Sequence, residues 1–110
     1  MLPSYRVNSQ GLVNGLVLRN RQGTLVGLTI RNTGPDQEIQ LFDSAAVPAD
    51  GTIPSYPPIR VSAGTTVSFD MPETGIPFDN GITVCNSSTV PTKTIGAADC
   101  YFGAVIRSQI

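Results

Sequence analysis

The chain has 110 residues, of which 40% are hydrophobic and only 14% are charged, and its formal net charge is −1. A chain of this length forms one domain and can bury about two thirds of its unfolded surface. Histidine is absent, which excludes Ser-His-Asp and Cys-His nucleophile pairs and His-ligated metals, so we expect no enzyme, no cofactor and no metal.

The low charge and its distribution bear on possible partners. A charged fraction of 14% is typical of a surface partly covered by another molecule, although a surface rich in Ser and Thr explains it as well. Residues 1–35 carry four arginines and no acid, whereas residues 36–110 carry three cations and eight acids. A basic first third indicates either a nucleic-acid contact or docking on an acidic protein surface. Because these arginines are scattered, we expect no nucleic-acid partner.

The first fourteen residues, MLPSYRVNSQGLVN, differ from the rest of the chain. They contain no apolar run of the kind found in a signal peptide, and no part of the chain approaches eighteen consecutive apolar residues. We therefore expect synthesis in a cytoplasm and no membrane partner. Weak alternation predicts that residues 1–14 form an N-terminal arm that orders against a partner, with a frayed terminus as the alternative.

Residues 15–110 predict a single all-β domain, because short β-branched runs are separated by Gly, Pro, Asn and Asp. The first strands are expected at residues 15–20 and 24–32, where Val26, Leu28 and Ile30 should face the core. A strand at residues 38–43 follows. It leads into the stretch FDSAAVPADGTIPSYPPI, a stiff connection with four prolines.

The second half of the chain continues the same pattern. Two strands are expected around the turn at Ala63-Gly64, then a second long loop, PETGIPFDNG, and final strands at residues 82–87 and 100–108. About eight short antiparallel strands result, with tight and long links in alternation. This alternation is typical of Greek-key crossings, so we predict a jelly-roll-like sandwich, with an immunoglobulin-like sandwich as the alternative.

The two cysteines, Cys85 and Cys100, lie fifteen positions apart and have no neighbours suited to a zinc site. In a cytoplasm they should be reduced thiols packed in or beside the core. Their positions near the ends of two expected strands leave a disulfide open.

Four stretches share a pattern of turns and alternation: IQLFDSAAVPADGTIP, IRVSAGTTVSFDM, GIPFDNGITVCNSST and CYFGAVI, which together cover about Ile39 to Ile106. In this pattern the chain resembles small β-sandwich virion proteins of tailed bacteriophages. Its size and its separate N-terminal segment are most similar to the capsid decoration, or cement, proteins of epsilon15-like short-tailed phages.

The resemblance implies a non-enzymatic protein on the outside of the virion head, made in the host cytoplasm, that bridges and stabilises subunits of the major capsid protein. It also implies self-association on the shell, as a dimer or a trimer. A carbohydrate- or receptor-binding sandwich module of a phage tail or fibre is the alternative.

A capsid staple needs rigid loops, since proline-stiffened segments lose little conformational entropy on docking. The interface candidates are the apolar, aromatic or basic residues of the arm and of the two long loops. They are Leu2, Pro3, Tyr5 and Arg6 in the arm, Ile53, Tyr56 and Pro57 in the proline-rich connection, and Ile76 and Phe78 in the second loop. Tyr56 would suit a sugar platform as well as a protein anchor, and Phe78 could instead plug the end of the sandwich.

Overall fold

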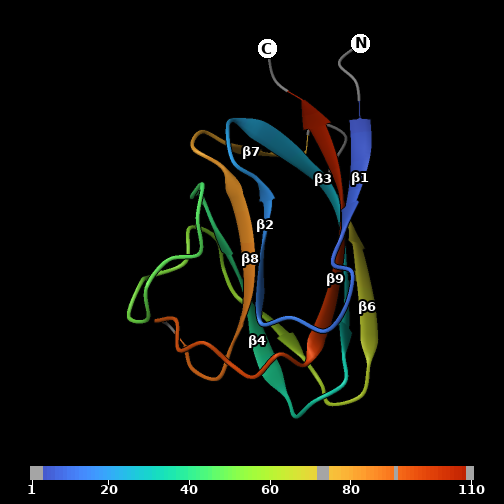
Figure 1. The fold of residues 1–110 in the computed structure, drawn as a ribbon, viewed down its shortest axis with the longest axis vertical. Helices are drawn as coiled ribbons and strands as arrows, with labels where there is room; N and C mark the ends of the chain where they lie inside the picture. The colour runs from blue at the N-terminus through green and yellow to red at the C-terminus, as the bar shows by residue number, and fades with distance from the viewer. Residues whose placement is uncertain (1–3, 72–74, 91, 109–110) are drawn as a thin grey trace.

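The computed structural model describes residues 4–71, 75–90 and 92–108, and this part of the chain contains nine β-strands and no helix (Figure 1). The strands are β1 (Ser4–Asn8), β2 (Gly15–Arg19), β3 (Gly23–Asn32), β4 (Gln37–Phe42), β5 (Ile59–Val61), β6 (Thr66–Asp70), β7 (Ile76–Phe78), β8 (Ile82–Ser87) and β9 (Cys100–Ser108). They form two antiparallel sheets. The first sheet has the order β1-β9-β3-β6, with β7 also paired to β3, and the second has the order β2-β8-β4-β5.

The strand pairs are nested along the chain. Strand β1 pairs with β9, β2 with β8, β3 with β6 and β4 with β5, as in one long hairpin folded over on itself. The additional pairs β3–β9 and β4–β8 then join the strands into two sheets. This double-sheet arrangement is a jelly roll, so the predicted all-β sandwich is confirmed.

The core lies between the two sheets and is made by alternate residues of the long strands. On β9, Phe102, Ala104 and Ile106 point inward and are at most 5% exposed. The facing sheet contributes Ile39, Leu41, Ile82 and Val84. Each fully buried aliphatic or aromatic side chain stabilises the fold by about 1.5–3 kcal/mol.

The inward set predicted for β3 is wrong at one position. A β-bulge between Leu25 and Gly27 leaves Val26 opposite no residue of β9. Because a bulge inserts one residue, it reverses the alternation on one side of itself. Leu25 is therefore fully buried in the core and Val26 is only partly buried, while Leu28 and Ile30 face inward as expected.

The N-terminal segment is part of the first sheet rather than a separate arm. Every residue from Ser4 to Asn8 is in register with β9, and Tyr5 and Val7 pack against the core. The hydroxyl of Tyr5 accepts a hydrogen bond of 2.7 Å from Arg19 Nη1. Five residues with two inward apolar positions give only a short alternating signal, which explains why the sequence alone did not identify this edge strand.

The second long loop also contains a strand that was not expected. Strand β7 pairs with residues 23–25 at the start of β3. The chain enters β7 through Gly75, which has a φ of 73° and lies so close to β3 that a Cβ would be 2.9 Å from the carbonyl oxygen of Leu25. A glycine is needed at this position for both reasons.

A buried polar cluster connects the two sheets at one end of the sandwich. Asn32 at the end of β3 accepts a hydrogen bond of 3.2 Å from Gln37 Nε2 at the start of β4. Asn86 of β8 donates to Gln37 Oε1 and, at 2.9 Å, to the carbonyl oxygen of Ala97. All three cluster side chains are at most 4% exposed. Most of their amide groups bond to each other and to the backbone in place of water, whereas Asn86 Oδ1 has no hydrogen-bond partner among the described residues.

Two irregular segments form a third layer over the second sheet. We call residues 43–58 the strap and residues 88–90 and 92–99 the link; both lie outside β4 and β8 (Figure 1). On the face of the second sheet that points away from the core, Gln40, Thr83, Cys85 and Ser87 are all 0% exposed. Strand β8 is therefore buried at every position, on both of its faces.

Candidate functional site

The described residues offer little for catalysis. They contain no group of three or more His, Cys, Asp or Glu residues that could hold a metal ion. The same part of the chain includes no helix of sufficient length and apolarity to cross a membrane. The two outer faces of the sandwich differ sharply, and the candidate sites lie on them.

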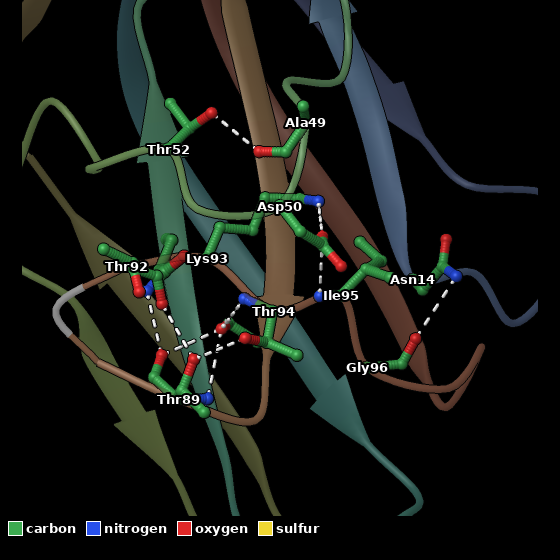
Figure 2. Close-up of polar contacts among 12 residues, drawn as sticks. Asn14, Ala49, Asp50, Thr52, Thr89, Thr92, Lys93, Thr94, Ile95 and Gly96 are labelled. Atoms are coloured by element: carbon green, nitrogen blue, oxygen red, sulfur yellow. Dashed lines mark hydrogen bonds and ion pairs between the residues drawn. The ribbon is translucent and has the colours of Figure 1, made fainter.

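The strap and the link are joined by two backbone hydrogen bonds. The backbone N–H of Gly51 donates to the carbonyl oxygen of Lys93 at 2.7 Å, and Lys93 N–H donates to Thr52 O at 2.8 Å. The Thr52 hydroxyl closes the adjacent turn by donating to Ala49 O at 2.6 Å (Figure 2). These bonds tie the strap to the link through backbone atoms on both sides.

A buried lysine strengthens the same junction. The Lys93 side chain is 3% exposed, and its Nζ donates to Asp50 Oδ1 at 2.7 Å. Asp50 also accepts a hydrogen bond from the backbone N–H of Ile95 at 3.1 Å (Figure 2). The hydrogen bonds from Lys93 and Ile95 hold the pKa of the Asp50 carboxyl below its usual value. Because a buried ammonium group needs a partner, this ion pair fastens the strap to the link.

Hydroxyl groups fix the link to the second sheet. Thr89 Oγ1 lies 2.9 Å from the carbonyl oxygen of Thr92 and 2.8 Å from Thr94 Oγ1 (Figure 2). Ser87 Oγ, on the outer face of β8, donates to Thr89 O at 2.8 Å and accepts from Thr94 N–H at 3.0 Å. The link is consequently tied to the strand that it covers.

The far end of the strap is held by Tyr56. Its hydroxyl donates to the carbonyl oxygen of Pro77 at 2.6 Å, and its ring centroid lies 5.0 Å from that of Phe78 at a tilt of 56°. Burial, together with the nearby carboxylates of Asp43 and Asp79, raises the pKa of Tyr56. Tyr56 is therefore a brace within the molecule, whereas the sequence predicted an exposed anchor.

The outer surface of this braced layer is apolar at three points. Val47 and Ile53 of the strap are 46% and 70% exposed, and Val90 of the link is 51% exposed. They account for three of the five large hydrophobic side chains that are exposed in the described residues. We call these three side chains the strap–link surface.

The structure divides the predicted interface residues among different environments. Ile53 and Pro57 are exposed on the strap, and Arg6 is exposed on the first sheet. Ile76 is partly buried against the core, and Phe78 is 1% exposed, so Phe78 plugs the end of the sandwich and cannot contact a partner. Tyr5 is partly buried and bonded to Arg19, and the remaining candidates, Leu2 and Pro3, lie outside the described residues.

The opposite face of the molecule carries a hollow that the sequence did not indicate. It lies on the outer side of the first sheet and has a volume of about 520 Å³. Arg6, Arg31, Asp70 and Tyr101 are among its lining residues, and they come from four different strands. Their proximity depends on strand register, which has no local signal in the sequence.

Neither cysteine contributes to a reactive site. Cys85 and Cys100 are both free and fully buried, which confirms the predicted thiols. Burial raises the pKa of each thiol to about 11. Both are therefore protonated at neutral pH and are poor nucleophiles.

Comparison of the chain with protein-family models, curated proteins and solved structures gives no match. Function must therefore be inferred from the two outer faces and from the residues that they present.

Proposed function

We propose that this protein is a non-enzymatic bacteriophage capsid decoration protein that bridges neighbouring subunits of the major capsid protein from outside the head. The resemblance between Ile39 and Ile106 to small phage virion proteins supports the proposal. Jelly rolls occur in viral capsid proteins as well as in lectins, so the fold agrees with this role by analogy alone.

The observation that carries the proposal is the strap–link surface. Val47, Ile53 and Val90 are exposed on a layer that the Lys93–Asp50 ion pair and the Tyr56 contacts hold in place. A rigid loop loses little entropy when it docks, so more of the contact energy is available for binding. The same layer buries the outer face of the second sheet, which leaves its own outer side to meet a partner.

The size of this surface favours attachment at several points. Burying a fully exposed Val or Ile side chain contributes about 1.5–3 kcal/mol, and since Val47, Ile53 and Val90 are 46%, 70% and 51% exposed, together they supply about 2.5–5 kcal/mol. Association of two molecules costs about 4–15 kcal/mol. One copy at one subunit would therefore bind weakly, whereas a dimer or trimer that bridges subunits of a closed lattice gains from the high effective concentration of the second contact.

The test is co-sedimentation of the purified chain with phage heads assembled without it. We expect saturable binding at a copy number that follows the number of capsomers. The variant Ile53→Ser should bind about tenfold more weakly than the wild type, or weaker still. Leu12→Ser is the matched control, because Leu12 is an exposed apolar residue, at 42%, that belongs to neither the strap nor the link.

Two results would contradict the proposal. One is wild-type binding by Ile53→Ser and Val90→Ser together. The other is a copy number of three, six or a small multiple of these per particle, far below the number of capsomers, which is the stoichiometry of a tail or fibre module.

A further inference from the structure

The outer face of the first sheet remains open to solvent, in contrast to the outer face of the second. The side chains that point outward come from the four strands of the main order. They are Ser4, Arg6 and Asn8 on β1, Tyr101, Gly103 and Val105 on β9, Gly27, Thr29 and Arg31 on β3, and Thr66, Ser68 and Asp70 on β6. We call the depression among them the outer hollow.

Two glycines create the outer hollow. Gly103 lies opposite Thr29, and Gly27 lies opposite Val105, so the two positions without a side chain are diagonal neighbours on β9 and β3. A Cβ on Gly103 would come within 2.8 Å of Asn8 Oδ1, which shows that the Asn8 side chain lies over this gap. The resulting volume of about 520 Å³ is within the range of ligand sites.

One end of the outer hollow combines an aromatic ring with a guanidinium group. Tyr101 is 42% exposed and lies directly across from Arg31 in the register of β9 and β3. Within the part of the chain that the structure describes, Arg31 makes one long hydrogen bond of 3.4 Å, to Thr66 Oγ1, so its other N–H groups are available.

The other end and the floor carry further polar groups. Arg6 on β1 and Asp70 on β6 flank the pair Val105–Gly27. No hydrogen bond or ion pair joins the side chains of Arg6, Asp70 or Asn8 to another residue in the described ranges 4–71, 75–90 and 92–108. The hydroxyls of Thr29 and Ser68, 3.0 Å apart, lie between the two ends.

The chemistry of this lining selects among ligand classes. An apolar ligand would contact two apolar side chains, Tyr101 and Val105, in a shallow depression, so it would bury little apolar surface there. A nucleic-acid strand normally stacks successive bases on several rings, and here one ring is present. A protein partner would find Tyr101 and the arginines as anchors, but the Asn8, Ser68 and Asp70 side chains around them offer little apolar area to bury. Hydroxyl, amide, carboxylate and guanidinium groups around a single tyrosine ring instead suit a sugar, which needs many hydrogen bonds and one flat apolar surface.

The charges specify the sugar further. Arg6 and Arg31 give two cations against the single carboxylate of Asp70. A guanidinium group binds a carboxylate through two parallel hydrogen bonds. We propose that the outer hollow binds an acidic oligosaccharide, with carboxylates held by Arg6 and Arg31 and a sugar ring stacked on Tyr101.

The geometry also sets the length of this ligand. Arg6 and Arg31 lie on strands separated by β9, and their partners on β9, Val105 and Tyr101, are four residues apart. At usual strand spacings this places the two arginines about 10 Å apart across the sheet and about 14 Å apart along it. These are backbone separations, and a chain of several sugar rings is long enough to contact both guanidinium groups at once.

This inference stands independently of attachment to a phage head, because the outer hollow and the strap–link surface belong to different sheets. If both proposals are correct, a chain docked through its strap and link presents the outer hollow away from the shell.

The test is a titration of isotope-labelled protein with hexagalacturonate, followed by NMR, with maltohexaose as a neutral probe of the same length. We expect saturable shifts at the backbone amides of β9 and β3 with hexagalacturonate and about tenfold weaker binding of maltohexaose. Arg31→Gln and Tyr101→Ala should each weaken hexagalacturonate binding by about tenfold or more. Arg21→Gln is the matched control, because Arg21 is an exposed arginine outside the outer hollow.

Three outcomes would overturn the proposal. The first is the absence of saturable shifts at about 10 mM hexagalacturonate. The second is equal binding of the two sugars, which would exclude the acidic assignment. The third is loss of head binding by Arg31→Gln and Tyr101→Ala without any sugar binding by the wild type, which would make this face a protein interface.

Discussion

Replacing Asn32 by leucine should test whether the buried polar cluster holds the two sheets together. Asn32 is 0% exposed, and its Nδ2 donates to the carbonyl oxygens of Pro35 at 2.7 Å and Val61 at 3.2 Å. Its Oδ1 accepts from Gly34 N–H at 3.0 Å and from Gln37 Nε2 at 3.2 Å. Leucine has nearly the same size, so the substitution removes these bonds without opening a large cavity.

The bonds to Val61 and Gln37 are fully buried, so no water can replace them. Gln37 Nε2 keeps a long hydrogen bond of 3.5 Å to Asp99 Oδ2, so its loss is partial. A buried group left without a partner costs about 1–3 kcal/mol, and Asn32→Leu should therefore lower the free energy of unfolding by about 2–4 kcal/mol. That is a large part of the 5–15 kcal/mol typical of a domain.

The assay is urea unfolding followed by far-UV circular dichroism, with Asn20→Leu as an exposed control that should change stability by at most about 0.5 kcal/mol. A loss below about 1 kcal/mol for Asn32→Leu, with an unchanged denaturant slope, would refute the reasoning.

Three further predictions concern the core and the third layer. Phe78→Ala should cost about 3–5 kcal/mol in urea unfolding because Phe78 is buried, whereas a cost near zero would show that it is not part of the core. Cys85 and Cys100, with pKa values of about 11, should react with a disulfide reagent at pH 8 only as fast as the protein opens, and rapid reaction in the folded state would contradict their burial. The folded-state pKa of Asp50 lies below its ordinary 3.8, so its contribution to stability is complete above about pH 4 and is lost as the pH falls through the folded value. Asp50→Asn should therefore be less stable than wild type at neutral pH, with a difference that disappears towards pH 2, and a difference independent of pH would exclude the ion pair with Lys93 as its source.

Alternation predicted the strands that have one face in the core and one in solvent. On β6, the partly buried Val67 and Phe69 alternate with exposed residues, and on β9 the same rule places Phe102 and Ile106 inward. The rule did not locate Val26, because a bulge arises from the pairing of two strands and leaves no mark in either strand alone.

The missed features share one physical cause, which is dependence on distant partners. Strand β7 has three residues and is stable only because β3 supplies its hydrogen bonds. The third layer depends on contacts such as the bond of 2.8 Å from the Thr83 hydroxyl to the carbonyl oxygen of Ser44, 39 positions away. Of the proposed sites, Ile53 was predicted from its loop, whereas the outer hollow depends on the register of four strands.

The nested strand pairs also determine the order in which the protein can fold as it leaves the ribosome. Closing a loop of about 100 residues to pair β1 with β9 directly would cost about 4 kcal/mol in chain entropy. Closing β4–β5 first and adding the outer pairs in turn keeps each remaining loop short. Strand β9 is the last of the nine described strands to be synthesised, and it lies between β1 and β3. A nascent chain that ends before residue 100 therefore contains the other eight strands but offers β1 no neighbour. Completion of the first sheet must therefore wait until β9 has left the ribosome, so β1, the first strand to be made, is among the last to find its partner.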